Sequence, residues 1–225
     1  RELIVATLRF EGPFSVAVSG SDDGSEYWDL ARSQYGSFTP MTRHVSARSV
    51  VEAVRDQVAT VGILPLPRPD DEERWWPLMV SEAPDMPRII ARLPFIPADS
   101  KKKIGPEALV ICSVRQEESG RDHSFLGINA EEDVGFGAID KALSQVGVSA
   151  VFNQLWHDPN PPAAWIYLVE VDDFLDSDGP GMRHLKDGLG PHIKSVVHLG
   201  GYAMPLNKAD LETDTLSDST PEQGS

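Results

Sequence analysis

The chain has 225 residues, of which 40% are hydrophobic, enough for one large hydrophobic core or two modest ones. Its formal net charge of −15 at pH 7 argues against nucleic acid or an anionic membrane surface as a partner. No stretch approaches the roughly 18 apolar residues of a membrane span and no signal peptide is recognised, so we expect a cytoplasmic protein with no membrane partner.

The opening segment, RELIVATLRFEGPFSVAV, has helical spacing that is followed by a break. Apolar residues at Leu3 and Leu8 suggest a helix, and Gly12-Pro13 is a stop signal because proline disfavours helix in the residue before it. About ten residues are too few to hold a helix alone in water. We therefore expect this helix to be the end of a longer chain that continues upstream of Arg1.

Residues up to about 120 predict an alternation of strands and helices typical of an α/β domain. In chain order we expect a strand at 14–19, helices at 26–36 and from residue 46, and strands at 60–66, 88–96 and 107–114. A proline-rich, charged turn lies between the second and third of these strands, and its Trp75 and Trp76 are expected to pack between lobes rather than cover a ligand. The single cysteine, Cys112, lies in the apolar run ALVICSV, which indicates a buried residue.

The sequence texture changes near residue 120, where we place a domain boundary. The next segments predict, in order, a strand, a helix, two strands, a helix and a strand, at 123–130, 135–147, 148–156, 164–172, 181–193 and 195–203. This βαββαβ order is typical of a ferredoxin-like sandwich. From 207 to 225 five acidic residues accompany one lysine without a hydrophobic period, so we expect a disordered acidic tail.

These segments, in this order, resemble a prephenate dehydratase followed by its ACT domain. Gly137-Ala138-Ile139 matches the Gly-Ala-Leu at the start of the family's ACT helix, and WIYLVEVDDFLD through HLGGYAMP is similar to its closing strand, helix and strand. The opening segment resembles the last mutase helix of proteins that fuse chorismate mutase to prephenate dehydratase, which function in phenylalanine biosynthesis. The resemblance implies the end of a mutase helix at 1–12, a two-lobed, periplasmic-binding-protein-like dehydratase domain at 13–120, and an ACT-like domain at 121–206.

The dehydratase site that the resemblance implies is altered. A Thr-Arg-Phe motif of the family corresponds to Glu107-Ala108-Leu109, so a carboxylate and a methyl group replace a hydroxyl and a guanidinium. The change reverses the charge offered to a dianionic substrate, which needs charge-assisted hydrogen bonds. The family's Pro-Ile-Glu-Asn-Ser motif corresponds to the segment 65–69, which has neither Asn nor Ser.

The family's first glycine loop appears here as GSDDGS. Gly24 and Ser25 would preserve an anion-binding turn, but Asp22 and Asp23 would repel prephenate. With two motifs lost and one damaged, we expect the dehydratase activity to be lost.

The ACT resemblance implies a ligand site at the start of the second-half helix. Gly135, Gly137, Ala138 and Ile139 would let backbone amides approach an amino-acid effector, although glycines here equally ease the start of a helix. The family's Glu-Ser-Arg-Pro motif is missing from the corresponding FNQLWHDP, which leaves the effector open. Related domains pair with one another, so we expect a homo-oligomer.

The mutase remnant offers Thr7 and Glu11, which match a hydroxyl and a Glu or Gln that hydrogen-bond chorismate in the resembled helix. They lie four residues apart and so share one helical face, but they are equally consistent with capping a helix end. The cationic residues that the chorismate mutase reaction needs would lie upstream of Arg1. The six histidines lack metal-site spacing, and we expect no metal and no cofactor.

Three functions remain open at this point. The chain is a regulatory or dimerising portion of a mutase, a non-catalytic module that senses a small ligand, or an active dehydratase with a rearranged site. The ligand would be chorismate, prephenate or an aromatic amino acid.

Overall fold

The computed structural model describes residues 14–20, 25–71, 73–95, 105–160 and 163–204. The expected mutase helix at 1–12 and the expected acidic tail at 207–225 lie outside these residues. Within them, no helix combines the length and the apolar composition that crossing a membrane requires. We call residues 14–120 the N-terminal half and residues 121–204 the C-terminal half.

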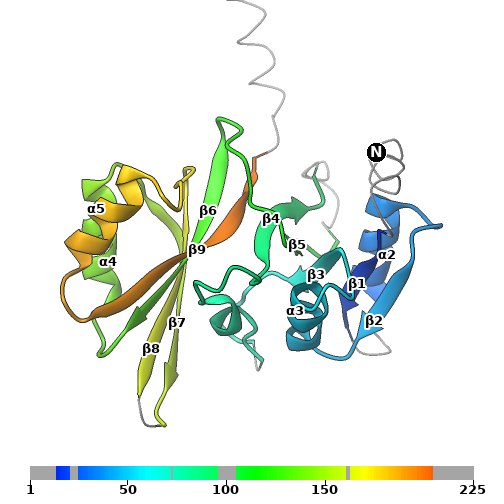
Figure 1. Cartoon of the computed structure of the whole chain (residues 1–225), viewed down its shortest axis with the longest axis horizontal. Helices are drawn as coiled ribbons and strands as arrows, with labels where there is room; N and C mark the ends of the chain where they lie inside the picture. The colour runs from blue at the N-terminus through cyan, green and yellow to red at the C-terminus, as the bar shows by residue number, and fades with distance from the viewer. Residues whose placement is uncertain (1–13, 21–24, 72, 96–104, 161–162, 205–225) are drawn as a thin grey trace, which may run out of the picture.

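Both halves contribute to one sheet of nine strands, in the order β2-β1-β3-β5-β4-β9-β6-β8-β7 (Figure 1). The strands of the N-terminal half are β1 (Val16–Ser19), β2 (Met41–His44), β3 (Val61–Pro65), β4 (Arg88–Leu93) and β5 (Ala108–Cys112). Those of the C-terminal half are β6 (Asp122–Ala130), β7 (Ala150–Asp158), β8 (Ala164–Val171) and β9 (Ile193–Ala203). The sheet is therefore mixed, with parallel pairing at its β2 end and antiparallel pairing at its β7 end.

Two helices cover opposite faces of the N-terminal half of the sheet. Helix α3 (Ala47–Arg55) begins at Ser46, whose hydroxyl accepts a hydrogen bond from the Ser49 amide, as a helix N-cap does. Its valines pack with Ala17 of β1, whereas α2 (Ser25–Tyr35) packs on the residues either side of Ala17. Alternate strand residues point to opposite faces, so this double cover explains why all four residues of β1 are buried.

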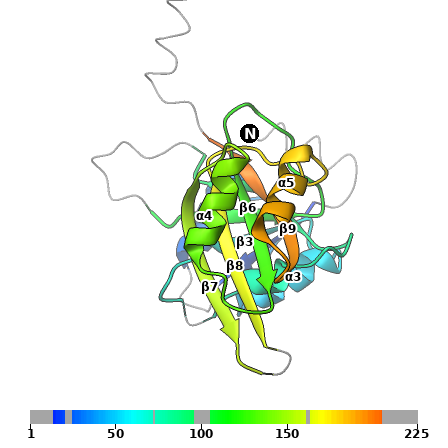
Figure 2. The same cartoon turned by 90° about the vertical axis from the view of Figure 1, so that its left-hand side faces the viewer.

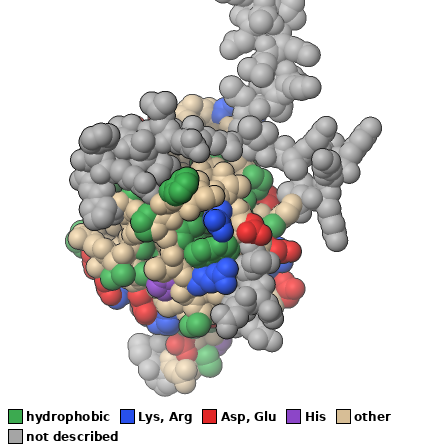
Figure 3. Space-filling view, turned by 90° about the vertical axis from the view of Figure 1, so that its right-hand side faces the viewer, with side chains coloured by type: hydrophobic (Ala, Val, Ile, Leu, Met, Phe, Trp, Pro, Cys, Tyr) green, Lys and Arg blue, Asp and Glu red, His purple; other side chains and the backbone are tan. Residues whose placement is uncertain are grey.

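The sequence predicts the buried strands but not β2, which pairs in parallel with β1. Three of its four residues, MTRH, are polar, and the strand is partly exposed because it is the edge strand of the sheet. The Arg43 guanidinium lies 4.6 Å from the centre of the Trp28 ring. Figure 3 shows this end of the molecule, where hydrophobic, basic and acidic side chains are interspersed.

The expectation of two lobes within 13–120 is corrected by the structure. In the described part of this range, the five strands form one continuous section of sheet, and a second lobe is not found. The reason is the connection after β3, which returns directly to the same sheet as the antiparallel pair β4 and β5.

The C-terminal half has the element order βαββαβ, with strands in the order β9-β6-β8-β7. Helices α4 (Phe136–Gln145) and α5 (Pro180–Leu189) lie side by side on one face of these strands (Figure 2). Buried Ile139 and Leu143 of α4 and Leu185 of α5 pack there on the strand residues. The opposite face is left for another part of the chain to cover.

The segment between β3 and β4 covers that face. It contains the short 3-10 helix η1 (Trp76–Met79), and Trp75 and Trp76 are both 1% exposed. The two tryptophans therefore pack in the core, against the sheet and not between two lobes. The Trp76 indole donates a hydrogen bond of 3.1 Å to the buried Gln154 of β7. Gly127 of β6 lies so close to Val80 that a Cβ atom on it would come within 2.5 Å of a Val80 methyl group.

The two halves join where β4 pairs with β9 in parallel at Ile89 and Gly200. Gly200 has φ +100°, and a Cβ atom there would lie 2.1 Å from the Ile89 carbonyl oxygen. A residue with a side chain fits neither the backbone conformation nor the space. Gly200 therefore permits the close backbone approach that makes one sheet from two halves.

We predict that Gly200→Ala lowers the free energy of unfolding by about 3 kcal/mol or more, because positive-φ strain and a clash with rigid backbone add. Gly147→Ala is the matched control, since Gly147 also has positive φ but open space around its Cβ position. It should lose only about 1 kcal/mol. Urea denaturation measures both, and equal losses would show that the close approach at Gly200 is unimportant.

Candidate functional site

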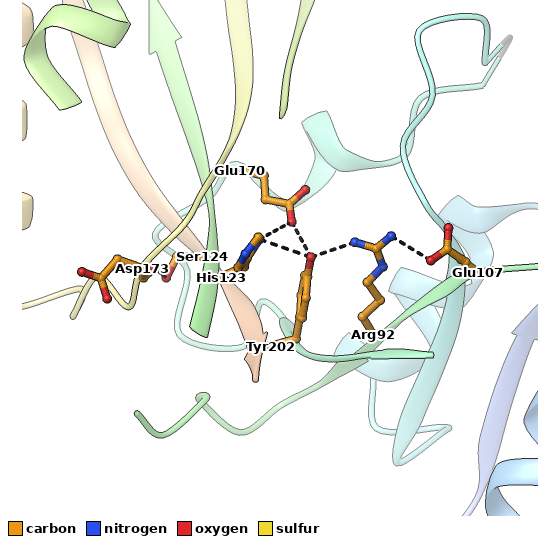
Figure 4. Close-up of polar contacts among 7 residues, drawn as sticks. All are labelled: Arg92, Glu107, His123, Ser124, Glu170, Asp173 and Tyr202. Carbon is orange, nitrogen blue, oxygen red and sulfur yellow. Dashed lines mark hydrogen bonds and ion pairs between the residues drawn. The ribbon is translucent and has the colours of Figure 1, made fainter. Parts of the chain in front are cut away.

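A network of polar side chains crosses the join between the halves, with Arg92 of β4 at its centre (Figure 4). One Arg92 Nη atom donates to the Tyr202 hydroxyl at 2.9 Å, and the other donates to Glu107 Oε1 at 2.8 Å. The guanidinium also lies 5.6 Å from the centre of the Tyr202 ring. Arg92 is therefore held from both sides, by a carboxylate of its own half and a hydroxyl of the other.

The network continues into the C-terminal half through the Tyr202 hydroxyl. This hydroxyl accepts from Arg92 and donates to Glu170 of β8, whose carboxylate also binds Nδ1 of His123 at 2.8 Å. The Tyr202 and His123 rings lie against each other with their centres 5.3 Å apart. Glu170 is only 6% exposed, so these contacts replace the water that a carboxylate otherwise requires.

The contacts set the charge states of the central groups. Burial, together with the nearby Glu170 carboxylate, raises the pKa of Tyr202, so its hydroxyl stays protonated and donates. Burial alone would lower the pKa of Arg92, but the bonds to Tyr202 and Glu107 outweigh burial and raise it. The network is thus a chain of fixed donors and acceptors rather than a set of groups ready to exchange protons.

Ser124 and His123, which are neighbours in β6, are residue types that can act as a nucleophile and a base. They are not placed to act together. Ser124 Oγ donates to the Asp173 carbonyl and accepts from the Leu175 amide, which anchors the loop after β8. His123 is the adjacent residue, so its ring lies on the opposite face of the strand. The pair therefore lacks the hydrogen bond that activates a serine.

The residues expected at the dehydratase site have different environments in the structure. Glu107 is half-exposed and belongs to the network, where its carboxylate neutralises Arg92. Ala108 is fully buried among apolar residues such as Leu93, so it forms no part of an accessible site and an arginine there would be placed in the core. Ser25 is the first residue of α2, whereas Gly24, Thr7 and Glu11 lie outside the described residues.

The expected ligand positions lie at the start of α4. Gly135 is the N-cap residue with φ 71°, and its amide already donates to Asp133 and to the Tyr167 hydroxyl. Gly137 and Ala138 are exposed, and a Cβ atom on Gly137 would meet nothing within 4 Å. Ile139 points the other way and is fully buried, so its side chain packs in the core and does not face a ligand.

Sequence reasoning missed most of the network. Arg92, His123, Glu170 and Tyr202 come from four strands, and their proximity depends on the strand order. One signal was available, because Glu170 interrupts the apolar run WIYLVEV, and a carboxylate in a buried strand needs a partner. Among the residues that the structure describes, no group of three or more His, Cys, Asp or Glu side chains is arranged to hold a metal.

Comparison with known proteins identifies the fold. The prephenate dehydratase from Arthrobacter aurescens in complex with L-Phe superposes with a TM-score of 0.61 and 10% identity, covering 90% of this chain and 97% of that one. The prephenate dehydratase from Streptococcus mutans gives 0.57 and 15%, covering 86% and 100%. A protein described as GqqA, a novel type of quorum quenching acylase, gives 0.59 and 13%, covering 84% and 94%.

The chain therefore has a fold similar to that of prephenate dehydratases. The sequence matches no family model, and a search of curated proteins found no significant match.

We predict that Tyr202→Phe lowers the free energy of unfolding by about 1–3 kcal/mol, because it removes a donor to the buried Glu170 and an acceptor for Arg92. Tyr27→Phe is the control, since the Tyr27 hydroxyl makes no hydrogen bond within the described part of the chain. It should change stability by less than about 0.5 kcal/mol. A Tyr202→Phe protein as stable as the parent in urea would show that the network contributes nothing to the join.

Proposed function

We propose that this chain is a non-catalytic protein of the prephenate dehydratase fold that binds a small ligand, in the first place an aromatic amino acid. Its role would be regulatory, within aromatic amino-acid biosynthesis, and would include control or dimerisation of a mutase joined upstream. The C-terminal half would serve as an ACT-type sensor and would associate with a second copy of the chain.

The pairing of Arg92 with Glu107 carries the first part of this proposal. Decarboxylation and dehydration of a dicarboxylate require cationic groups that are available to the substrate. The Arg92 guanidinium, which contacts the expected site residue Glu107, is neutralised by that carboxylate at 2.8 Å and oriented by Tyr202. The neighbouring Ala108 offers no polar atom and is buried. Prephenate would therefore meet a carboxylate where it needs a donor.

The start of α4 supports the second part. The first amides of a helix lack intrahelical acceptors and favour anionic groups. In α4 the exposed Gly137 adds no side chain that would keep a ligand or a second chain away from these amides. A structure with a similar fold is that of a prephenate dehydratase in complex with L-Phe. A carboxylate of a free amino acid is the kind of group that this end of the helix would bind.

The absence of dehydratase activity is tested by supplying prephenate and following phenylpyruvate. We expect no turnover, and about one turnover per second or faster would refute the proposal. Glu107→Gln removes the charge that neutralises Arg92, so we expect prephenate binding to strengthen about tenfold without turnover. The exposed Glu118→Gln is the control and should leave binding unchanged.

Amino-acid sensing is tested by calorimetry with L-phenylalanine, L-tyrosine and L-tryptophan. We expect at least one to bind, and Gly137→Val to weaken that binding at least about tenfold because its side chain blocks the helix start. The exposed Lys141→Val, one turn further along α4, is the control for a valine on this helix and should bind normally. Equal affinity in the two variants would place the ligand elsewhere.

A further inference from the structure

A cavity of about 300 Å³ lies where β4, β9 and α5 meet, and none of the residues discussed so far as expected site residues lines it. Arg88 at the start of β4 reaches it from the N-terminal half, and His198 of β9 and Met182 of α5 reach it from the C-terminal half. The register of β4 shifts between Ile89 and Ala91, so Arg88 and Arg92 face opposite sides of the sheet. The cavity is therefore separate from the Arg92 network.

Arg88 brings an unpaired donor to the cavity. One of its Nη atoms donates to the Ser81 carbonyl at 3.1 Å, which holds the side chain in place. The other, Nη1, is buried and has no hydrogen-bond partner among the described residues. A buried guanidinium nitrogen without an acceptor is costly, so the site is incomplete as it stands.

Gln116 brings an unpaired acceptor. Its amide nitrogen donates to Asp122 Oδ1 at 2.7 Å, which fixes the orientation of the amide because a flipped group would direct oxygen at a carboxylate. Its Oε1 atom is consequently the one left buried without a donor. Nε2 of His198 is a third buried atom without a partner in this part of the chain. Three residues that line this cavity thus each carry a buried polar atom without a partner among the described residues.

The charges around the cavity favour an anion. Arg115 is paired with Asp178 at 3.0 Å and Lys186 with Glu82 at 3.7 Å, and all four side chains are at least 42% exposed. Arg88 has no carboxylate within ion-pair distance among the described residues, so one positive charge inside remains uncompensated. Burial and the charge of Arg88 lower the pKa of His198 to about 4, which leaves the imidazole neutral at pH 7 and able to donate from Nε2 in one tautomer.

The cavity also has an apolar wall, formed by Met182 and Val196, which are both nearly fully buried. We infer that this cavity binds a small carboxylic acid with an apolar body and a hydrogen-bond donor beside the carboxylate, such as an α-amino or α-hydroxy acid. The carboxylate accepts from Arg88 Nη1 and His198 Nε2, and the ammonium or hydroxyl donates to Gln116 Oε1. The volume is at the small end of ligand pockets, so the body is no larger than that of an ordinary amino acid.

Four probes with one carbon skeleton test this inference by calorimetry and by amide chemical shifts. L-valine and 2-hydroxyisovalerate carry both the carboxylate and the donor, isovalerate lacks the donor, and valinamide lacks the carboxylate. We expect the first two to bind at millimolar concentrations or below, isovalerate about tenfold more weakly, and valinamide not at all. The shifted amides should include those of Val197 and Gly200.

Variants connect the binding to the cavity. Arg88→Met keeps the aliphatic stem but removes the charge, and should weaken L-valine binding at least about tenfold, while Arg48→Met on the exposed face of α3 changes nothing. Arg88→Lys keeps the charge and serves as a second variant if the methionine protein unfolds. Gly137→Val should bind L-valine normally, which separates this site from the one proposed at α4.

Three results would overturn the inference: no binding of any carboxylate at millimolar concentrations, equal binding of valinamide, or unchanged binding by both Arg88 variants. Tighter binding of inorganic phosphate than of L-valine would also overturn it, because the cavity would then be a simple anion site without the selectivity given by its apolar wall.

Discussion

The contact between the Gly200 and Ile89 backbones holds the two halves of the chain in one sheet. Without this contact there would be two separate sheets. Strand β4 would be an edge of a five-stranded sheet, and β9 an edge of a four-stranded sheet. Exposed strand edges invite pairing with other chains, and mutual pairing removes both. The polar network and the cavity lie on opposite sides of this join. Each takes residues from both halves, so each exists only because the join does.

The network shows how charged side chains at the join are satisfied within the protein itself. Arg92 and Glu107 would each be costly if left half-buried without a partner, but together with Tyr202 and Glu170 they form one chain of hydrogen bonds. The Arg92 guanidinium in this chain of contacts links the two halves of the sheet. An arginine paired with a carboxylate of the protein stabilises the fold, whereas an arginine without such a partner can bind the carboxylate of a ligand.

Much of the secondary structure follows from the sequence, because buried strands such as LVIC and YLVEV are rich in apolar residues and are bounded by loops. Two elements do not follow. Strand β2 is an edge strand of polar residues that only the neighbouring β1 makes into a strand, and η1 takes its shape from the sheet that it covers. Local patterns carry no signal for either, since tertiary contacts determine both.

The site was predictable only in part, for a related reason. The sequence places a carboxylate at Glu107 and predicts that it disfavours an anionic substrate, but it does not reveal that Arg92 lies across from it on β4. For Ala108 the comparison of motifs suggested a site position, whereas the strand direction turns the side chain into the core. Which face a residue takes depends on register, and a bulge such as that in β4 changes the face without any mark in the sequence.

The packing of Trp76 and Val80 on β6 and β7 limits how the chain can be divided into fragments. The residues that cover the open face of the C-terminal half are encoded between β3 and β4, more than forty positions before β6 begins. A fragment that starts near residue 120 would expose one apolar face of its sheet to solvent. A fragment that stops there would expose Trp75 and Trp76, which lose the strands of the C-terminal half on which they pack. Each half therefore depends on the other for part of its buried surface.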